Sequence, residues 1–200
     1  GRLTSPPSLP AHRMERGTIR VDGLLNEPDW TTAPAATGFT EFEPDRGGEP
    51  AEETVLKVVY DDDAIYFGIA CCRLNGTPVT SSLARRDNIV GSDLIRLYLS
   101  PYHDMVTGYH FRVNPDGVKE DYYNYGDLYH DVSWDAVWDA ETSVDPDGWY
   151  AEIRIPFSSI RVPAGVPSVR QTSQPVAGSQ WRKKTMPFTA VGTGMSEASA

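Results

Sequence analysis

The sequence feature that most constrains the fold is a series of short apolar segments that turn-forming residues separate at regular intervals. Thr54 to Tyr60 is strand-like, and the acidic turn Asp61 to Asp63 leads directly into a second strand, Ala64 to Cys72, so the pair predicts a β-hairpin. The turns Asn114 to Gly117 and Asp145 to Gly148 both contain Pro-Asp-Gly between further strand-like segments. Roughly nine such segments without a long amphipathic helix predict an all-β protein. We expect an antiparallel β-sandwich of the immunoglobulin-like or jelly-roll-like kind.

The other expected strands alternate apolar and polar residues over a few positions. They are Ile19 to Val21, Phe39 to Phe42, Leu94 to Leu99, Tyr109 to Val113, Val118 to Tyr123, Val137 to Val144 and Trp149 to Ile155. Short helical turns are expected at Glu27 to Trp30, with Asn26 as a possible cap, and at Ser158 to Ile160.

The two ends of the chain differ from the middle in composition. Residues 1–16 contain Pro6, Pro7 and Pro10 and predict an extended leader. Residues 163–200 scatter Pro, Ser, Gly and Thr without apolar periodicity, which predicts a poorly ordered or divergent tail. The folded domain is therefore expected to span residues 17–162.

Charge and hydropathy exclude several classes of partner. The net charge of -10 gives no general attraction for nucleic acid or an anionic membrane surface. No apolar run is long enough for a transmembrane helix. The only cysteines are the neighbours Cys71 and Cys72, so the chain is not a disulfide scaffold.

The segment from Pro115 to Asp147 is the strongest candidate for a binding site. It holds ten acidic residues against a single basic one, Lys119, and aromatic residues lie between them. Aromatic rings stack on the apolar faces of sugars, and carboxylates and amides bind the hydroxyl groups, so the mixture favours a carbohydrate site. The alternative is that Tyr122, Trp134 and Trp138 fill the core while the acids face solvent.

Two further groups of polar residues could complete a site or hold a metal. Arg85 to Asn88 precedes the expected strand Leu94 to Leu99, and its arginines can bind planar or anionic groups or pair with aspartates. Oxygen-rich turns favour calcium as a structural ion, with Asp61, Asp62 and Asp93 as candidate ligands. No nucleophile elbow and no zinc-protease pattern occur, so we do not expect an enzyme.

In order, these pieces resemble the family 9 carbohydrate-binding module. The resemblance rests on Ile19 to Trp30, Thr54 to Tyr66, Ser92 to Leu94, Phe111 to Gly117 and Gly148 to Phe157. Arg85 to Asn88 and Asp131 to Trp138 look like the N-terminal domain of bacterial envelope proteins that carry a predicted outer-membrane β-barrel region. The resemblance implies an immunoglobulin-like sandwich, structural calcium, sugar binding through aromatic side chains and export from the cytoplasm.

The first hypothesis is a non-catalytic carbohydrate-binding module of an exported bacterial protein that recognises an oligo- or polysaccharide. Relatives are often attached to a glycoside hydrolase or serve a carbohydrate catabolic system, so any hydrolase activity would belong to an attached domain. The alternative is a structural or interaction domain of an outer-membrane transport or assembly protein. Either implies an extracytoplasmic location: periplasm, outer membrane or secreted. The expected ligand-binding residues are Trp134, Trp138, Tyr122, Arg86, Asp87, Asn114 and Asp116.

Overall fold

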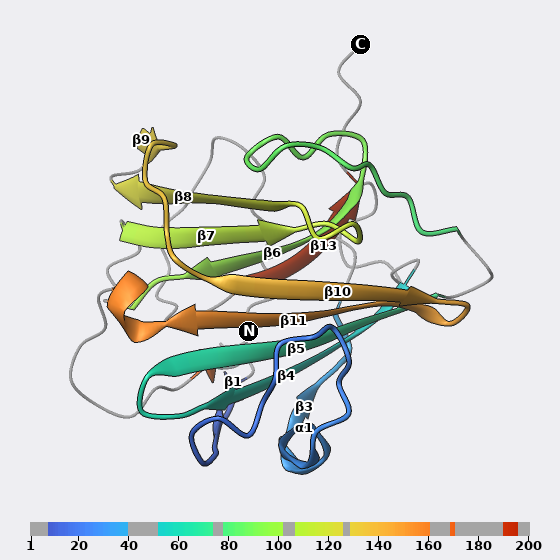
Figure 1. Ribbon diagram of the computed structural model, residues 1–200, viewed down its shortest axis with the longest axis vertical. Coiled ribbons are helices and arrows are strands. Elements are labelled where there is room, and N and C mark those ends of the chain that lie inside the picture. The colour runs from blue at the N-terminus through green and yellow to red at the C-terminus, as the bar shows by residue number, and fades with distance from the viewer. Residues whose placement is uncertain are drawn as a thin grey trace, which may run out of the picture.

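Two β-sheets face each other across an apolar core in the computed structural model (Figure 1). This arrangement confirms the predicted all-β sandwich. The structure describes residues 8–39, 52–73, 78–101, 107–125, 129–160, 169–170 and 190–195, without the side chains of Ser8, Glu52 and the last two segments. No helix in those ranges has the length and apolar character that a membrane span requires.

The first sheet contains the predicted hairpin at its centre. Its order is β10 (Asp139–Asp145), β11 (Gly148–Pro156), β5 (Ala64–Arg73), β4 (Glu52–Tyr60) and β2 (His12–Arg13), and β3 (Ala35–Ala36) also pairs with β4. All neighbours are antiparallel except β2, which runs parallel to β4. A separate pair joins β1 (Ser8–Leu9) to β12 (Val169–Arg170).

The second sheet is antiparallel throughout. Its order is β13 (Ala190–Met195), β6 (Asp93–Leu99), β7 (Thr107–Val113), β8 (Lys119–Tyr125) and β9 (Tyr129–Asp131). In Figure 1 its strands lie above those of the first sheet.

Side-chain oxygens close the three predicted turns. The Asp61 carboxylate accepts the backbone N–H groups of Asp63 and Ala64, each at 2.8 Å. Asn114 Oδ1 accepts the N–H of Val118 at 2.8 Å. Asp145 Oδ1 accepts the N–H of Gly148 at 3.0 Å. Because Asp and Asn bond to the backbone two to four residues on, these turns could be predicted from sequence.

Alternate side chains of both sheets meet in the core. Phe67 and Ile69 on β5 and Leu97 and Phe111 on β6 and β7 are fully buried in one apolar cluster. Burial of each such side chain is worth roughly 1.5–3 kcal/mol. The period-two alternation of the strands thus fixes which face of each sheet is turned inward.

A short helix, α1 (Pro28–Thr32), covers the outer face of the first sheet. Trp30 lies over Gly68, where an added Cβ would come within 3.0 Å of the indole ring. The indole N–H donates to Glu152 at 2.7 Å, and the other Glu152 oxygen accepts the N–H groups of Asp22 and Gly23. The fully buried Glu152 therefore fastens the N-terminal segment to β11.

Several local expectations differ from the structure. Ile19 to Val21 forms no strand; Ile19 instead packs in the apolar cluster around Trp30. Asn26 does not cap the helix, which begins one residue after Glu27 without a side-chain cap. Of the expected strand Phe39 to Phe42, only Phe39 lies within the described residues.

The leader and the tail both contribute strands. β1 and β2 come from the leader, and β12 and β13 come from residues 163–200. The remaining residues of the tail lie outside the described part of the chain, so its predicted character stays a prediction there.

Candidate functional site

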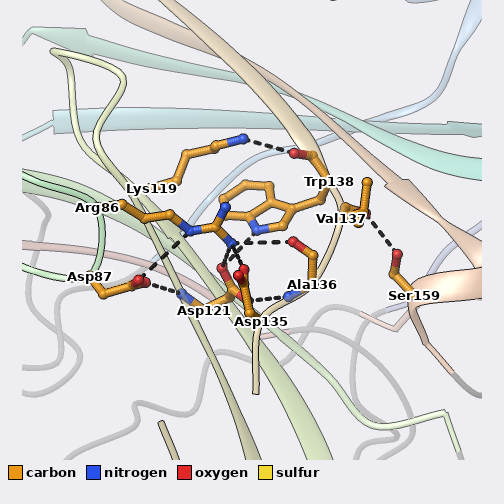
Figure 2. Close-up of polar contacts among 9 residues, drawn as sticks. All are labelled: Arg86, Asp87, Lys119, Asp121, Asp135, Ala136, Val137, Trp138 and Ser159. Carbon is orange, nitrogen blue, oxygen red and sulfur yellow. Dashed lines mark hydrogen bonds and ion pairs between the residues drawn. The ribbon is translucent and has the colours of Figure 1, made fainter. Parts of the chain in front are cut away.

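Arg86 lies between the carboxylates of Asp121, on β8, and Asp135 (Figure 2). Its Nη2 is 2.5 Å from oxygens of both Asp121 and Asp135 and 3.2 Å from the carbonyl oxygen of Ala136. Burial lowers the pKa of Arg86, but the hydrogen bond and the charges of Asp121 and Asp135 outweigh that effect and raise it. The guanidinium is therefore held by groups of this chain.

Asp121 is the centre of this network. Its side chain is 1% exposed, and its two oxygens accept hydrogen bonds from Arg86, from the indole N–H of Trp138 at 3.0 Å and from the backbone N–H of Ala136 at 2.7 Å. A buried carboxylate paired and bonded in this way satisfies the general requirement for a buried charge. The network ties β8 to the segment that leads into β10.

Neither predicted stacking tryptophan stands on an open surface. Trp138 is 2% exposed, and its ring meets Phe111 edge-on with centroids 5.2 Å apart. Lys119 Nζ lies 5.1 Å from the centre of the same ring, so the buried Trp138 offers no free face to a sugar. Trp134 is partly buried against the rings of Tyr109 and Phe111. The alternative reading, that these rings belong to the core, fits Trp138.

Three of the other predicted ligand residues lie in or beside turns. Asn114 is fully buried. Its side-chain oxygen accepts the N–H of Val118 and its amide nitrogen donates to the carbonyl oxygen of Ser82, so this side chain serves the turn rather than a ligand. Asp87 has a left-handed φ of 64° and pairs with Arg86 at 3.7 Å. Asp116 is exposed in its turn. Ligand roles for Arg86, Asp87 and Asp116 stay predictions.

Tyr122 lies on the outer face of the second sheet, among buried polar side chains. The ring is 8% exposed and stacks on His110 with centroids 4.2 Å apart, and its hydroxyl accepts a hydrogen bond from Arg112 at 2.9 Å. Tyr122 therefore presents little of its ring to solvent. We call this surface the polar face; it comprises Arg96, His110, Arg112, Glu120, Tyr122 and Asn124.

The exposed aromatic rings are not those of the predicted ligand residues. They belong to Tyr125 and Tyr129, where β8 and β9 meet. These side chains are 49% and 65% exposed, and they are direct partners in the strand register. Their ring planes lie 13° apart with centroids 5.8 Å apart, and Tyr123 continues the series toward Trp134. Sequence placed both tyrosines in the aromatic segment but could not single them out, because their exposure depends on where the facing sheet ends.

The structure does not bring the three predicted metal ligands into one group. Asp61 accepts three hydrogen bonds within its own hairpin, including one from the Tyr66 hydroxyl at 3.0 Å. Asp62 is exposed and pairs with Arg13 at 2.6 Å. Asp93 lies on the other sheet and accepts the N–H of Thr80 at 2.9 Å.

Another set of carboxylates does converge. Within the described residues, Asp22, Glu27 and Glu152 each offer an oxygen within 4.8 Å of the others. One oxygen of Glu27 is buried there and has no hydrogen-bond partner in the part of the chain that the structure describes. Burial, and then the charge of Glu27 against opposing hydrogen bonds, raises the pKa of Glu152. Sequence analysis missed this group because β11 is far from the other two residues along the chain.

Comparison with known proteins supports the fold. No family model and no curated protein matches the chain. Two structures of a family 9 carbohydrate-binding module from Caldicellulosiruptor kristjanssonii are similar, each with a TM-score of 0.50 and 19% identity. The one in complex with cellotriose aligns over 73% of this chain and 67% of the module, and the one in complex with glucose over 78% and 70%. A candidate carbohydrate-binding protein from Bacteroides uniformis has a TM-score of 0.58 and 14% identity, with 78% and 75% covered. The chain therefore has the fold of these proteins.

Proposed function

We propose that this protein is a non-catalytic carbohydrate-binding module that uses Tyr125 and Tyr129 as its stacking surface. The observation that carries the proposal is the exposure of two nearly parallel aromatic rings at the end of one sheet. Such rings provide rigid apolar area for the C–H faces of sugars at a small cost in conformational entropy.

Polar groups near the tyrosine pair suit the hydroxyl groups of a sugar. Ser133 is exposed on the segment that follows Tyr129, and Asp131 accepts hydrogen bonds from both the N–H and the hydroxyl of Ser133. The shared fold with modules crystallised with cellotriose and glucose supports the same function by analogy.

The test is calorimetric titration with cello-oligosaccharides and other neutral oligosaccharides. Tyr125→Ala and Tyr129→Ala are each expected to weaken binding roughly tenfold, because the apolar contact of one ring is worth about 1–2 kcal/mol. Tyr150→Ala is the control, because this partly buried tyrosine lies on β11 of the other sheet. No heat from any sugar with a folded protein, or equal losses in all three variants, would contradict the proposal.

We also infer that the domain belongs to an exported protein and is attached to a glycoside hydrolase or a carbohydrate catabolic system. The sequence resemblance supports this inference. It is tested by reading the full-length gene for a neighbouring catalytic domain and by locating the protein in cell fractions. An intact gene without such a neighbour, in a cytoplasmic protein, would contradict it.

Structural calcium is proposed on the same grounds. The expected result is a melting temperature that rises with calcium and falls when a chelator is added, because an ion that binds only the folded state stabilises it. Equal melting temperatures in both conditions would remove this proposal.

A further inference from the structure

The side chains around the exposed tyrosine pair divide between the two faces of the second sheet. Tyr125 lies opposite Tyr129 in the register of β8 and β9, so the two rings share one face. Asp131 follows Tyr129 by two residues on the same strand, so its carboxylate lies on that face as well. His130 points to the other face, where its Nδ1 lies 2.6 Å from the Oδ1 of Asn124. The tyrosine pair therefore has a carboxylate, not an imidazole, on its own face.

The Asp131 carboxylate is held in place by the residues that follow it. It is partly exposed, and its Oδ1 accepts the backbone N–H of Ser133 at 3.0 Å and the Ser133 hydroxyl at 2.6 Å. The Ser133 hydroxyl contributes most to lowering the pKa of Asp131, and the backbone N–H groups of Ser133 and Trp134 add to the effect. Because these donors are neutral, the carboxylate keeps its negative charge. It is thus ionised at neutral pH and oriented before a ligand arrives.

The tyrosine rings on this face attract positive charge as well as apolar groups. Tyr125 and Tyr129 are 49% and 65% exposed, and their planes lie 13° apart. The face of an aromatic ring carries negative electrostatic potential, so it attracts a cation as well as the C–H groups of a sugar. Asp131 lies roughly 7 Å from Tyr129 along the strand, a distance that one sugar residue with its substituents can bridge. Stacking area and a fixed negative charge are therefore available to the same ligand.

We propose that this face selects amino sugars, whose protonated amino group binds Asp131 while the sugar ring stacks on Tyr125 or Tyr129. The inference rests on the proposed function, because it assigns a class of sugar to the same tyrosine pair. The ammonium group donates a charge-assisted hydrogen bond to the carboxylate, and the ring faces add to the attraction. A uronic acid would instead bring a second carboxylate close to Asp131, and the net charge of -10 acts in the same direction.

The experiment is calorimetric titration of the full chain at about pH 6 with three β-1,4-linked oligomers of equal length. They consist of glucosamine, N-acetylglucosamine or glucose. The amino groups of the first oligomer are largely protonated at this pH, whereas the other two oligomers are neutral. The glucosamine oligomer is expected to bind about three- to tenfold more tightly than either neutral oligomer at low salt. This preference should shrink at high salt, because salt screens an exposed ionic contact.

Asp131→Asn tests the carboxylate itself. Asparagine keeps the shape of the side chain and an oxygen for the Ser133 hydroxyl, but it carries no charge. The preference for the glucosamine oligomer is therefore expected to vanish in this variant. Binding of the two neutral oligomers should change by no more than about threefold, because a hydrogen-bond acceptor remains.

Asp147→Asn is the matched control for that variant. It removes the same charge from an exposed position in the turn between β10 and β11. Figure 1 shows this turn at the end of the sandwich opposite to β9. Asp147→Asn is therefore expected to keep the full preference for the glucosamine oligomer.

The outcomes separate this inference from the proposed function. A preference that only Asp131→Asn removes supports the inference. Binding of neutral oligomers without a preference for glucosamine, or a preference that survives in Asp131→Asn, overturns it and leaves the tyrosine pair as a sugar site. Equal losses in Asp131→Asn and Asp147→Asn would assign the preference to net charge and also overturn it. No binding of any oligomer by the folded protein would contradict the proposed function and the inference together.

Discussion

Glu152 shows how one residue couples distant segments at a cost in electrostatic free energy. The carboxylate accepts three N–H groups from the N-terminal segment, yet it is fully buried and lies near Glu27. Burial raises the pKa of Glu152 in the folded state. The contribution of this carboxyl to stability is therefore fully present at pH values below its pKa in the unfolded chain. That contribution is lost as the pH rises through the folded-state pKa.

Glu27→Gln is expected to increase the free energy of unfolding at pH 7 by about 0.5–1 kcal/mol, because it removes a like charge beside Glu152. The glutamine oxygen can keep the bond from the Arg20 N–H, and its amide replaces the unpartnered Glu27 oxygen. The gain should disappear at pH 4, where protonation removes the repulsion. Urea unfolding at both pH values measures this.

Glu53→Gln serves as the control for that measurement, because Glu53 is exposed on β4 of the same sheet and its register partner is Cys72. It should change stability by less than about 0.5 kcal/mol at either pH. A destabilised Glu27→Gln variant at pH 7, or a gain that persists unchanged at pH 4, would show that repulsion between the two carboxylates does not limit stability.

At the scale of elements, the turn at Asp22 and Gly23 is a close contact between the N-terminal segment and β10. Gly23 has φ 83°, and its carbonyl oxygen accepts a hydrogen bond from Ser143 at 2.7 Å. A Cβ at this position would lie 2.8 Å from the backbone carbon of Thr142. Glycine is therefore required both by the backbone conformation and by the space.

Gly23→Ala is expected to lower the free energy of unfolding by about 2–4 kcal/mol, of which roughly 1 kcal/mol reflects the left-handed conformation alone. Gly17→Ala isolates that part, because Gly17 has φ 78° with no atom within 4 Å of the added Cβ. Thermal or urea unfolding compares the two. Equal losses would mean that the contact with Thr142 relaxes without cost.

Elements differ in how far their sequence predicts them. The hairpin of β4 and β5 was predictable because its strands alternate and its turn carries its own hydrogen-bond acceptor. β13 was not, because Ala190–Met195 contains two glycines and no clear alternation. Its strand conformation depends on pairing with β6, a tertiary contact that local propensity does not encode.

At the scale of the whole molecule, the sequence predicted the sandwich but not which surfaces remain open. Core-facing positions follow from alternation, whereas the burial of Trp138 and the exposure of Tyr129 depend on how far one sheet covers the other. The predicted ligand set was therefore mixed. It included Asn114 and Trp138, which serve the fold, and it omitted Tyr125 and Tyr129.

β13 also protects the edge of the second sheet. Deletion of residues 190–200 would leave β6 with unpaired backbone groups along residues 93–98. We expect concentration-dependent association of the shortened protein, because an unpaired edge strand can pair with another chain. Light scattering over a concentration series measures this. Deletion of residues 196–200 alone keeps β13 and should leave the protein as it was; association in both deletions would contradict the role of β13.

The positions of the tryptophans have an optical consequence. Trp30, Trp138 and Trp149 are each at most 2% exposed, and they report on the outer cover of one sheet and on the core between the two. Their emission should change strongly when the chain unfolds. A sugar on Tyr125 and Tyr129 would touch none of these three tryptophans, so their emission would report unfolding of the chain and not the binding of that sugar.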